Sequence, residues 1–436
     1  RTNRPKVISS MQSRRNFIKH SCAISAAITF PTIIPARVLG KDAPSNQITV
    51  GFIGTGGHGI HRNLNMYLRQ KDARVLAACD VFKSRRDKAK RMIDQWYENK
   101  DCTTHNDFRE ILARKDIDTV MISTPDHWHT IMSLMAIRAG KDVQCEKPTL
   151  TIAEGRILAD TVKARKAVFQ TSTEDRSMRV YHRLAELVRN GRIGKLKTIR
   201  VKLPAGNRWA SDKPAPVPAD LDYDLWLGPA PETPYTPLRT EPMRWRQIWD
   251  YSGGLLTDWG AHQLDTAQWA NDTENTGPVA VEGEGTFNEG SMYNTAVDYK
   301  LKYTYANGVE MNVESGGTSL RFEGSEGWVG NSGWARTPEA SSKKILDSVI
   351  GPDETQLFTC REGEHRNFLD CVKSRKDPYL PAETGHRLAT LMHMGNISMR
   401  LGRKLQWDPQ KEEFIGDKEA NAMRTKPMRK PWKLTA

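Results

Sequence analysis

Cysteine is scarce in this sequence, with six residues in a chain of 436, and no two cysteines have the Cys-x-x-Cys spacing. Zinc ribbons and dithiol redox sites depend on that spacing, so the sequence excludes both. If Cys22 is removed with a leader peptide, five cysteines remain, and at least one thiol is unpaired within the chain. Cys79 and Cys145 lie in apolar runs, where we expect small buried hydrophobic residues.

Long apolar runs and an extended basic surface are also missing. No segment after residue 40 approaches the ~20 predominantly apolar residues that a membrane-spanning helix needs. The net charge is +13, but residues 1–40 hold seven arginines and lysines and no acid, which leaves +6 for the rest of the chain. A body so close to neutral, without a finger or RNA-binding motif, argues against a nucleic-acid partner. The length indicates about two or three globular domains.

Residues 1–45 have the pattern of an export leader and a linker. The segment SRRNFIK at residues 13–19 resembles the twin-arginine signal, and residues 20–35 behind it carry no charged side chain. We therefore expect Met11 to be the start, and the protein to be periplasmic or otherwise exported, with no stable membrane span afterwards. The alternative is a buried N-terminal helix, which Pro31 and Pro35 would break. No cleavage site is apparent.

From residue 47 the chain reads as strand, glycine turn, helix and strand. Residues 48–53 form an apolar strand, the turn GTGGHG follows at residues 54–59, and residues 60–70 can continue as a helix. A second strand over residues 74–80 ends on Asp80, 21 residues beyond Gly59. This context makes the glycine pattern a strong match to the dinucleotide-binding fingerprint.

Each residue of the fingerprint has an expected role. Gly54 permits the tight turn, Gly56 lets the backbone approach a pyrophosphate, and Gly59 permits close packing of the helix. The Asp80 carboxylate would accept the adenosine ribose hydroxyls and repel a 2′-phosphate, which predicts NAD.

NADP is the alternative cofactor, because Ser84, Arg85 and Arg86 follow and could contact a 2′-phosphate.

Further strands over residues 118–124 and 141–146 alternate with helices over residues 128–139 and 152–166. The pattern predicts an α/β fold with a doubly wound parallel sheet, which we assign to residues 46–171. Its ligand crevice should lie at the carboxyl ends of the strands.

Two groups of residues fall at those strand ends. The first runs from Ser123 through Thr124, Pro125 and Asp126 to His129, and the second is Glu146-Lys147-Pro148. A Glu-Lys-Pro at this position resembles the Gfo/Idh/MocA family, which includes glucose-fructose oxidoreductase and inositol dehydrogenase. In that family the lysine reaches the substrate hydroxyl and the glutamate lies by the nicotinamide ribose. The predicted cofactor contacts are Gly54, Gly56, Gly57, His58, Gly59, Asp80, Thr124, Pro125, His129, Glu146 and Lys147.

The second half of the chain carries independent evidence. On a helix, Asp258, His262 and Asp265 stand at i, i+4 and i+7, so Asp258 and His262 can meet and give an oriented imidazole. General base catalysis near neutral pH needs such a group. The segment that begins at Gly253 has a counterpart in the family, with the histidine as base and the aspartate holding it. Two other readings are a metal site on this carboxylate-histidine-carboxylate face and a purely structural polar face; we predict no metal.

The resemblance covers nearly the whole chain from residue 47, and residues 224–229, 401–408 and 426–432 look like those of an exported bacterial subgroup. It implies a C-terminal α+β domain over residues 172–436, with a large, mostly antiparallel open sheet. That sheet has an exposed face, which makes a dimer or tetramer plausible.

The resemblance and the residue types also predict a substrate site. Its members are Arg176, Trp245, Arg246, Asp258 and His262. The tryptophans Trp209, Trp226, Trp245 and Trp259 suit stacking under a sugar, and the alternative for each of them is a place in the core.

These expectations predict an NAD(P)-dependent oxidoreductase acting on the CH–OH groups of a carbohydrate. His262 would take the hydroxyl proton, Lys147 would stabilise the alkoxide, and Asp258 would orient His262. Outside the cytoplasmic membrane there is no ready supply of free NAD, so the cofactor should be tightly bound. One alternative is redox-neutral hydrolysis or elimination of a glycoside through a 3-keto intermediate. Another, of a different class, is a non-catalytic sugar-binding accessory protein.

Overall fold

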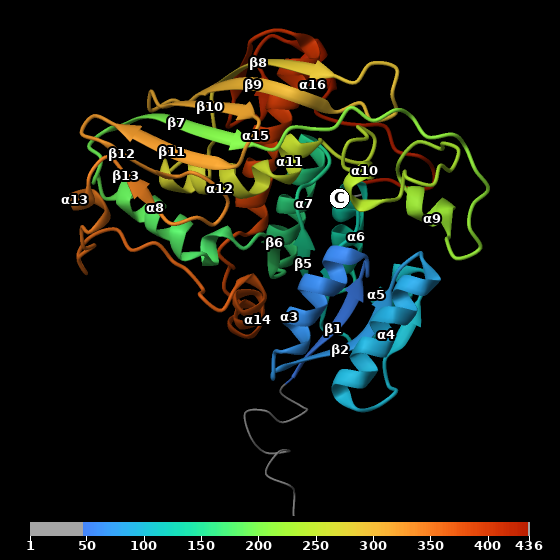
Figure 1. The fold of residues 1–436 in the computed structure, drawn as a ribbon. Coiled ribbons are helices and arrows are strands. Elements are labelled where there is room, and N and C mark those ends of the chain that lie inside the picture. Colours follow the sequence, from blue (N-terminus) through green and yellow to red (C-terminus); the bar gives the residue numbers. More distant parts are fainter. Residues whose placement is uncertain (1–46, 435–436) are drawn as a thin grey trace, which may run out of the picture. The chain divides into compact units, whose positions relative to one another are not determined.

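A computed structural model of the chain describes residues 47–434. The predicted export signal and linker, residues 1–45, lie outside the described residues. From Ile48 onward the chain forms one compact unit, which contains two β-sheets (Figure 1).

The first sheet has six strands, and every pair of neighbours in it is parallel. Its strands are β1 (Ile48–Ile53), β2 (Ala73–Cys79), β3 (Thr103–His105), β4 (Thr119–Ile122), β5 (Asp142–Glu146) and β6 (Phe169–Ser172). Their order is β3-β2-β1-β4-β5-β6, so the chain starts in the middle and winds toward both edges. This confirms the predicted doubly wound parallel sheet. The four strands predicted from apolar runs match the observed strands to within two residues at either end.

Helices cover both faces of this sheet, as its almost continuously apolar strands require. They are η2 (Gly59–Leu64), α3 (Asn65–Leu68), α4 (Lys83–Tyr97), α5 (Phe108–Ala113), α6 (Asp126–Arg138) and α7 (Ile152–Arg165). One hydrophobic cluster joins the strands to α5, α6 and α7. A second joins them to η2, α3 and α4, and also to α14 (Glu364–Ser374), which supplies Phe368 and Leu369. The first sheet therefore completes its core with a helix from far along the chain.

The helix predicted over residues 60–70 differs in detail from the observed one. Its first part, η2, is π-helical, and only α3 is an α-helix. The helix ends at Leu68 because the amide of Gln70 turns back to the carbonyl of Tyr67.

The second sheet has nine strands in the order β13-β12-β11-β7-β10-β9-β8-β14-β15. Its strands are β7 (Leu196–Leu203), β8 (Ala280–Phe287), β9 (Ala296–Thr304), β10 (Glu310–Ser315), β11 (Ser319–Gly324), β12 (Trp328–Asn331), β13 (Glu339–Ala340), β14 (Leu405–Asp408) and β15 (Glu413–Phe414). Only the pair of β7 and β10 is parallel, which confirms a mostly antiparallel sheet.

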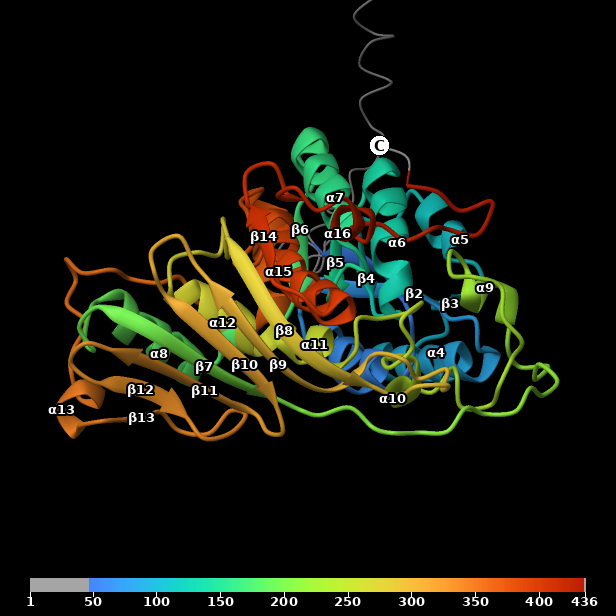
Figure 2. The same ribbon diagram turned by 90° about the horizontal axis from the view of Figure 1, so that it is seen from above.

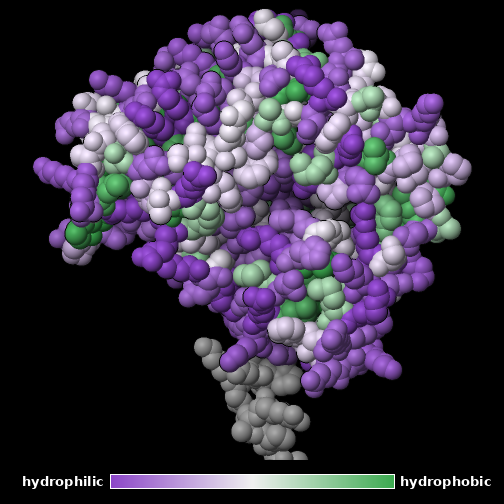
Figure 3. All heavy atoms as spheres, in the orientation of Figure 1, coloured by the Kyte–Doolittle hydropathy of each residue, from purple (hydrophilic) through white to green (hydrophobic). Residues whose placement is uncertain are grey.

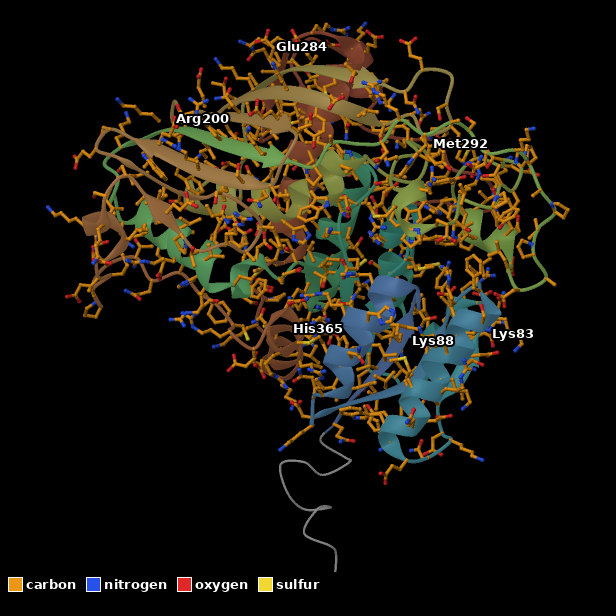
Figure 4. The ribbon with its side chains drawn as sticks, viewed as in Figure 1. Lys83, Lys88, Arg200, Glu284, Met292 and His365 are labelled. Carbon is orange, nitrogen blue, oxygen red and sulfur yellow. The ribbon has the colours of Figure 1, made fainter. Side chains whose placement is uncertain are left out.

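The two faces of this sheet differ sharply. The inner face packs on α8 (Arg179–Arg189), α12 (Gly260–Ala270) and α15 (Ala382–Leu401), in one large hydrophobic cluster. The outer face carries charged side chains that pair across strands, such as Arg200 with Glu323 and Lys202 with Glu314. Figure 4 shows Arg200 and Glu284 on this outer side. The dimer or tetramer expected for this face stays a prediction.

A long connection leaves β7 and returns to the edge of the first sheet before α11 (Leu255–Asp258) begins. It carries α9 (Tyr223–Leu227) and α10 (Pro242–Trp245) and has a small aromatic core of its own. Figure 2 shows it crossing from the second sheet toward α4 and α5. An isolated β-bridge joins Leu221 of this connection to Phe82, beside the carboxyl end of β2.

The remaining short elements are η3 (Asp175–Ser177), α13 (Lys343–Leu346) and α16 (Lys418–Ala422). No helix among residues 47–434 is both long and apolar enough to cross a membrane. The five cysteines of this part of the chain are all buried and unpaired, which confirms the expectation for Cys79 and Cys145.

Helix α15 fastens the two halves together, because it packs on α7 and β6 of the first half and on β8 of the second. Glycines permit the close approach. A Cβ atom on Gly385 would lie 2.1 Å from the hydroxyl oxygen of Thr171 in β6, and one on Gly155 in α7 would lie 2.4 Å from Nδ1 of His386.

We therefore expect Gly385→Ala to lower the free energy of unfolding by about 1–3 kcal/mol, as overpacking does. In a Thr171→Ala background, which removes the clashing hydroxyl, the same substitution should cost clearly less. Urea unfolding of the two single variants and the double variant measures this coupling. Strictly additive costs would contradict the close contact.

Candidate functional site

A cavity of about 390 Å³ opens at the carboxyl ends of the parallel strands, where the fold places ligands. In the space-filling view the surface is hollowed between α3 and α10 (Figure 3). Of the residues predicted from the sequence, the structure brings the following to this cavity: Gly54, Gly56, Gly57, His58, Gly59, Asp80, Thr124, Pro125, His129, Glu146, Lys147, Trp245, Arg246, Asp258 and His262. Arg176 lies elsewhere.

The glycine turn leaves open space on the side of the cavity. Gly54 has φ +90°, and a Cβ there would lie 2.5 Å from the carbonyl oxygen of Ser123, so only glycine fits. A Cβ on Gly59 would lie 2.3 Å from the Gly54 carbonyl oxygen. By contrast, a Cβ on Gly57 would meet no atom within 4 Å in the described part of the chain. The turn is therefore tight within the protein and open toward a ligand.

Asp80 is fixed at the end of β2, next to this turn. One carboxylate oxygen accepts the amide of Thr55 at 2.7 Å and its hydroxyl at 3.2 Å, and the other accepts the amide of Phe82 at 2.9 Å. Burial raises the pKa of Asp80 against these hydrogen bonds. Of the two neighbouring arginines, Arg86 donates to the Asp80 carbonyl and to Asn106, whereas Arg85 lies over the Phe82 ring and lines the cavity.

Glu146 is held from two sides at the end of β5. Its carboxylate lies 3.2 Å from Nε2 of His58 and accepts from Nδ2 of Asn63 at 2.8 Å. Burial opposes ionisation of Glu146, but His58, Lys147 and Asn63 hold its pKa well below the usual range. In turn, the hydrogen bond to Glu146 raises the pKa of His58.

Lys147, Asp258 and Arg246 form a cluster of charges at the centre of the cavity. The Lys147 ammonium donates to the Asp258 carbonyl at 2.8 Å and lies 3.2 Å from its carboxylate. Nε of Arg246 also lies 3.2 Å from this carboxylate. Burial disfavours the charged form of both Lys147 and Asp258, but their attraction raises the pKa of Lys147 and lowers that of Asp258. Both groups are therefore charged at neutral pH.

The expectation that Asp258 orients His262 is wrong. Nδ1 of His262 lies 3.1 Å from the hydroxyl of Thr173 and 3.2 Å from Oδ1 of Asp175. The i, i+4 spacing was a sound guide to proximity, but two cations hold the Asp258 carboxylate and attract it more strongly than a neutral imidazole does. Burial lowers the pKa of His262 to about 4, and Lys147 acts in the same direction. His262 is therefore an uncharged base at neutral pH.

The expectation that Arg176 contacts the substrate is also wrong. Its guanidinium is buried and binds both carboxylate oxygens of Asp265, at 2.8 and 2.7 Å, as well as Glu274 and the Tyr379 carbonyl. Because Asp265 is held in this way, Asp258, His262 and Asp265 do not form the metal-binding face considered as an alternative. The donor groups that do converge, within 4.8 Å of one another, are those of Glu174, Asp175 and His262.

The predicted tryptophans divide between the cavity and the core. Trp226, Trp245 and Trp259 line the cavity, whereas Trp209 packs edge-on against Tyr293 outside it, beneath the guanidinium of Arg244.

Sequence reasoning missed Asn63, Thr173 and Asp175. Asp126 was part of the strand-end group of residues 123–129 but was not assigned to the site. The available signal for Thr173 and Asp175 was position, because both follow β6, at the strand ends where ligands bind.

Asp126 generates a prediction about pH. It is buried in the wall of the cavity and accepts from the Ser252 hydroxyl at 2.7 Å. Burial raises its pKa from 3.8 to about 6. Its charge therefore costs stability fully above pH 6. This cost shrinks as the pH falls from 6 toward 4, because the folded state takes up a proton before the unfolded state does, and it is gone below pH 4, where both states are protonated.

The effect of Asp126→Asn on the free energy of unfolding should therefore depend on pH. Measured against the unmodified protein, the substitution should be about 2–3 kcal/mol more stabilising at pH 8 than at pH 4. Urea unfolding of both proteins at the two pH values measures the difference. A difference that does not change with pH would contradict the raised pKa.

Comparisons with known proteins agree with this geometry. Residues 48–173 match the Gfo/Idh/MocA profile described as an NAD-binding Rossmann fold of the oxidoreductase family, and residues 181–434 match the corresponding C-terminal alpha/beta domain. The α-N-acetylgalactosaminidase of Shewanella oneidensis is 31% identical over 169 residues, which cover 34% of this chain and 37% of that protein. The chain thus matches little more than a third of that curated relative's length.

Two solved structures share the fold. The aldose-aldose oxidoreductase of Caulobacter crescentus, complexed with glycerol, aligns with a TM-score of 0.61 and 17% identity, covering 83% of this chain and 99% of that one. The WlbA dehydrogenase of Bordetella pertussis, in complex with NADH and UDP-GlcNAcA, aligns with a TM-score of 0.62 and 14% identity, covering 83% and 99%. With both of its domains matched over most of its length, the chain belongs to the Gfo/Idh/MocA oxidoreductase family.

Proposed function

We propose that this protein is a nicotinamide-dependent oxidoreductase that interconverts a hydroxyl and a keto group on a carbohydrate. One observation carries the proposal: a cavity that has a dinucleotide-type glycine turn at one end holds a neutral histidine and a charged lysine at the other.

NAD is the cofactor that the residues fit best. The open turn at Gly56 and Gly57 leaves room for a pyrophosphate. The Asp80 carboxylate is held beside this turn, where it would accept the ribose hydroxyls. A 2′-phosphate would meet the Asp80 carboxylate, while Arg85 is the group that would favour NADP. When NAD is bound, the substrate carbon loses a hydride to it, the hydroxyl loses a proton to the protein, and the C–O bond becomes C=O.

The protein's own groups divide the remaining work. His262 is uncharged and buried, so it can take the hydroxyl proton. The Lys147 ammonium is held by Asp258 and stabilises negative charge on the reacting oxygen. In this proposal Asp258 positions Lys147, and the Asp258 carboxylate also pairs with Arg246.

Several features support a carbohydrate as substrate. Trp245 and Trp259 line the cavity beside its charged centre, and tryptophans in a binding site suit a sugar ring. Among proteins of the same fold, the Caulobacter enzyme is an aldose-aldose oxidoreductase, and the Bordetella enzyme was solved with a nucleotide sugar.

A second function has a specific observation in its favour. Curated relatives are named glycosyl hydrolase family 109 proteins, and one is named an α-N-acetylgalactosaminidase. The alternative is redox-neutral cleavage of a glycoside, in which a transient keto group acidifies the neighbouring C–H and the hydride returns to the sugar. Product analysis separates the two, because only the dehydrogenase leaves a reduced cofactor. An accessory sugar-binding protein would show no turnover at all.

We expect His262→Ala and Lys147→Ala each to lower kcat about 100-fold or more, because each removes a positioned group. NAD binding should persist in His262→Ala. A panel of free sugars and glycosides, assayed for both NADH absorbance and bond cleavage, provides the activity. His61→Ala is the matched control, since His61 is an exposed histidine of η2. Near-normal turnover of His262→Ala would remove the histidine from the mechanism.

We further propose that the protein is exported through the twin-arginine pathway and retains its cofactor tightly. The connection between β7 and α11 supports retention, because it docks beside the predicted adenosine site. Besides the Phe82–Leu221 bridge, Ser84 donates its amide and hydroxyl to Asp220, and Asn106 donates to Asp222 at 2.7 Å.

The C-terminal segment, residues 426–434, packs behind α9 and Trp128, which form part of the cavity wall. Arg429 donates to the carboxylate of Asp224 and to the Gly228 carbonyl, and so fastens α9. Trp432 packs edge-on against Trp128, which lines the cavity. Opening the adenosine end of the cavity therefore requires these contacts to break.

Protein purified without added cofactor should still carry NAD after prolonged dialysis, as a dissociation constant of about 1 nM or below requires. Absorbance shows the retention, and mass spectrometry of the extract distinguishes NAD from NADP. Arg429→Ala should release the cofactor at least about tenfold faster, whereas Arg403→Ala, at an exposed ion pair with Asp417, should not. An empty protein that works only with millimolar NAD would refute retention.

A further inference from the structure

The turn after β6 supplies the partners of one ring nitrogen of His262. Nδ1 of the imidazole has two partners there, the hydroxyl of Thr173 and Oδ1 of Asp175, at 3.1 and 3.2 Å. Thr173 and Asp175 are themselves fixed, because the Thr173 carbonyl accepts from the Tyr379 hydroxyl and Asp175 begins η3. The ring is thus held through one specified nitrogen.

Asp175 differs from the other carboxylates of the site in its surroundings. It is fully buried, and its second oxygen, Oδ2, has no hydrogen-bond partner in the described part of the chain. Among residues 47–434 no lysine or arginine is paired with Asp175, although Lys147, Glu174, Asp265 and Glu364 act on it electrostatically. Asp258, by contrast, is bound directly by an ammonium and a guanidinium.

We propose that Asp175, and not Asp258, is the positioning residue of His262, holding Nδ1–H so that Nε2 is the nitrogen free to take a substrate proton. The inference deepens the proposed function and rests on His262 as the base. Asp175 does not line the cavity, so its effect would pass through the orientation and tautomer of the ring.

The charges around the pair indicate how Asp175 acts. Burial, together with the carboxylates of Glu174 and Asp265, raises the pKa of Asp175 well above its usual range. A neutral carboxyl can accept Nδ1–H through Oδ1 without placing a negative charge beside the ring. An ionised partner would favour the imidazolium, whereas the pKa of His262 is lowered. Asp175 therefore orients the base while leaving it uncharged.

The same three side chains could instead hold a divalent cation, since Glu174, Asp175 and His262 offer donors within 4.8 Å of one another. Two cations oppose this. Nη2 of Arg62 lies 3.5 Å from the Glu174 carboxylate, and the Lys147 charge acts on both Asp175 and His262.

Paired substitutions separate the roles of the two aspartates. Asp175→Ala should lower kcat at least about tenfold with little change in cofactor retention, because the ring loses its orientation. Asp175→Asn should restore kcat to within about threefold of the unmodified protein, since a neutral amide oxygen can accept Nδ1–H. Asp258→Asn should not be rescued in this way, because it removes a charge that Lys147 needs. Failure of Asp175→Asn to restore activity would overturn the neutral-acceptor role.

A second readout does not depend on turnover. In the ¹⁵N spectrum of histidine-labelled protein, with His262 assigned by its absence in His262→Gln, Nδ1 should carry the proton at neutral pH. Asp175→Ala should mix the two tautomers, and Asp258→Asn should leave the Nδ1–H tautomer in place. An Nε2–H tautomer in the unmodified protein would overturn the inference even if the enzyme is active.

This readout also distinguishes failure of the inference from failure of the proposed function, since the tautomer is observable whatever the substrate is. Elemental analysis tests the remaining alternative, a metal site at this cluster. A divalent metal present at one per chain, and lost in Asp175→Ala, would assign the cluster to a metal site and overturn the inference.

Discussion

The ammonium of Lys147 stands where the two halves of the protein meet. Lys147 directly follows β5 of the parallel sheet. Its ammonium donates to both the backbone and the side chain of Asp258, which ends α11 in the second half. A charge this deeply buried is costly without partners, so the position of α11 relative to the first sheet is tightly constrained. The cavity exists because this contact and the packing of α15 hold the two halves at a fixed separation.

The cavity keeps its charged and uncharged groups apart. Glu146 and Asp258 are ionised because cations or donors surround them, whereas His262 is neutral because burial and Lys147 disfavour a second positive charge nearby. Asp258 is bound by the strongest donors near it. These donors are Lys147 and Arg246, whereas His262 takes hydroxyl and carboxyl partners from the turn after β6.

The sequence was most informative where local pattern decides the structure. The strand, glycine turn and strand that end on Asp80, and the Glu146-Lys147 pair after β5, could be placed because parallel strands all end at one edge. Helical spacing predicted that Asp258 and His262 lie close together. It could not predict their partners, because Lys147 follows β5 and Asp175 follows β6, far away in the sequence. Arg176 looked like a substrate ligand because nothing local reveals that Asp265 and Glu274 surround it.

Contacts between distant segments were equally hidden. Helix α14 completes the core on one face of the first sheet, and Nε2 of its His365 donates to the side-chain oxygen of Asn63 at 3.0 Å, in the helix that follows the glycine turn (Figure 4). The predicted domain boundary near residue 171 divides the sequence but not the hydrophobic core. Without α14, residues 48–172 would lack part of the apolar cluster that contains Phe52 and Met121.

The C-terminal segment has a consequence for how the protein is made. Residues 426–434 pack against α9 and Trp128 in the wall of the cavity, and both of these partners leave the ribosome well before that segment does. During synthesis the wall therefore lacks this backing until the segment emerges. The order of synthesis makes these contacts among the last to form around the cavity.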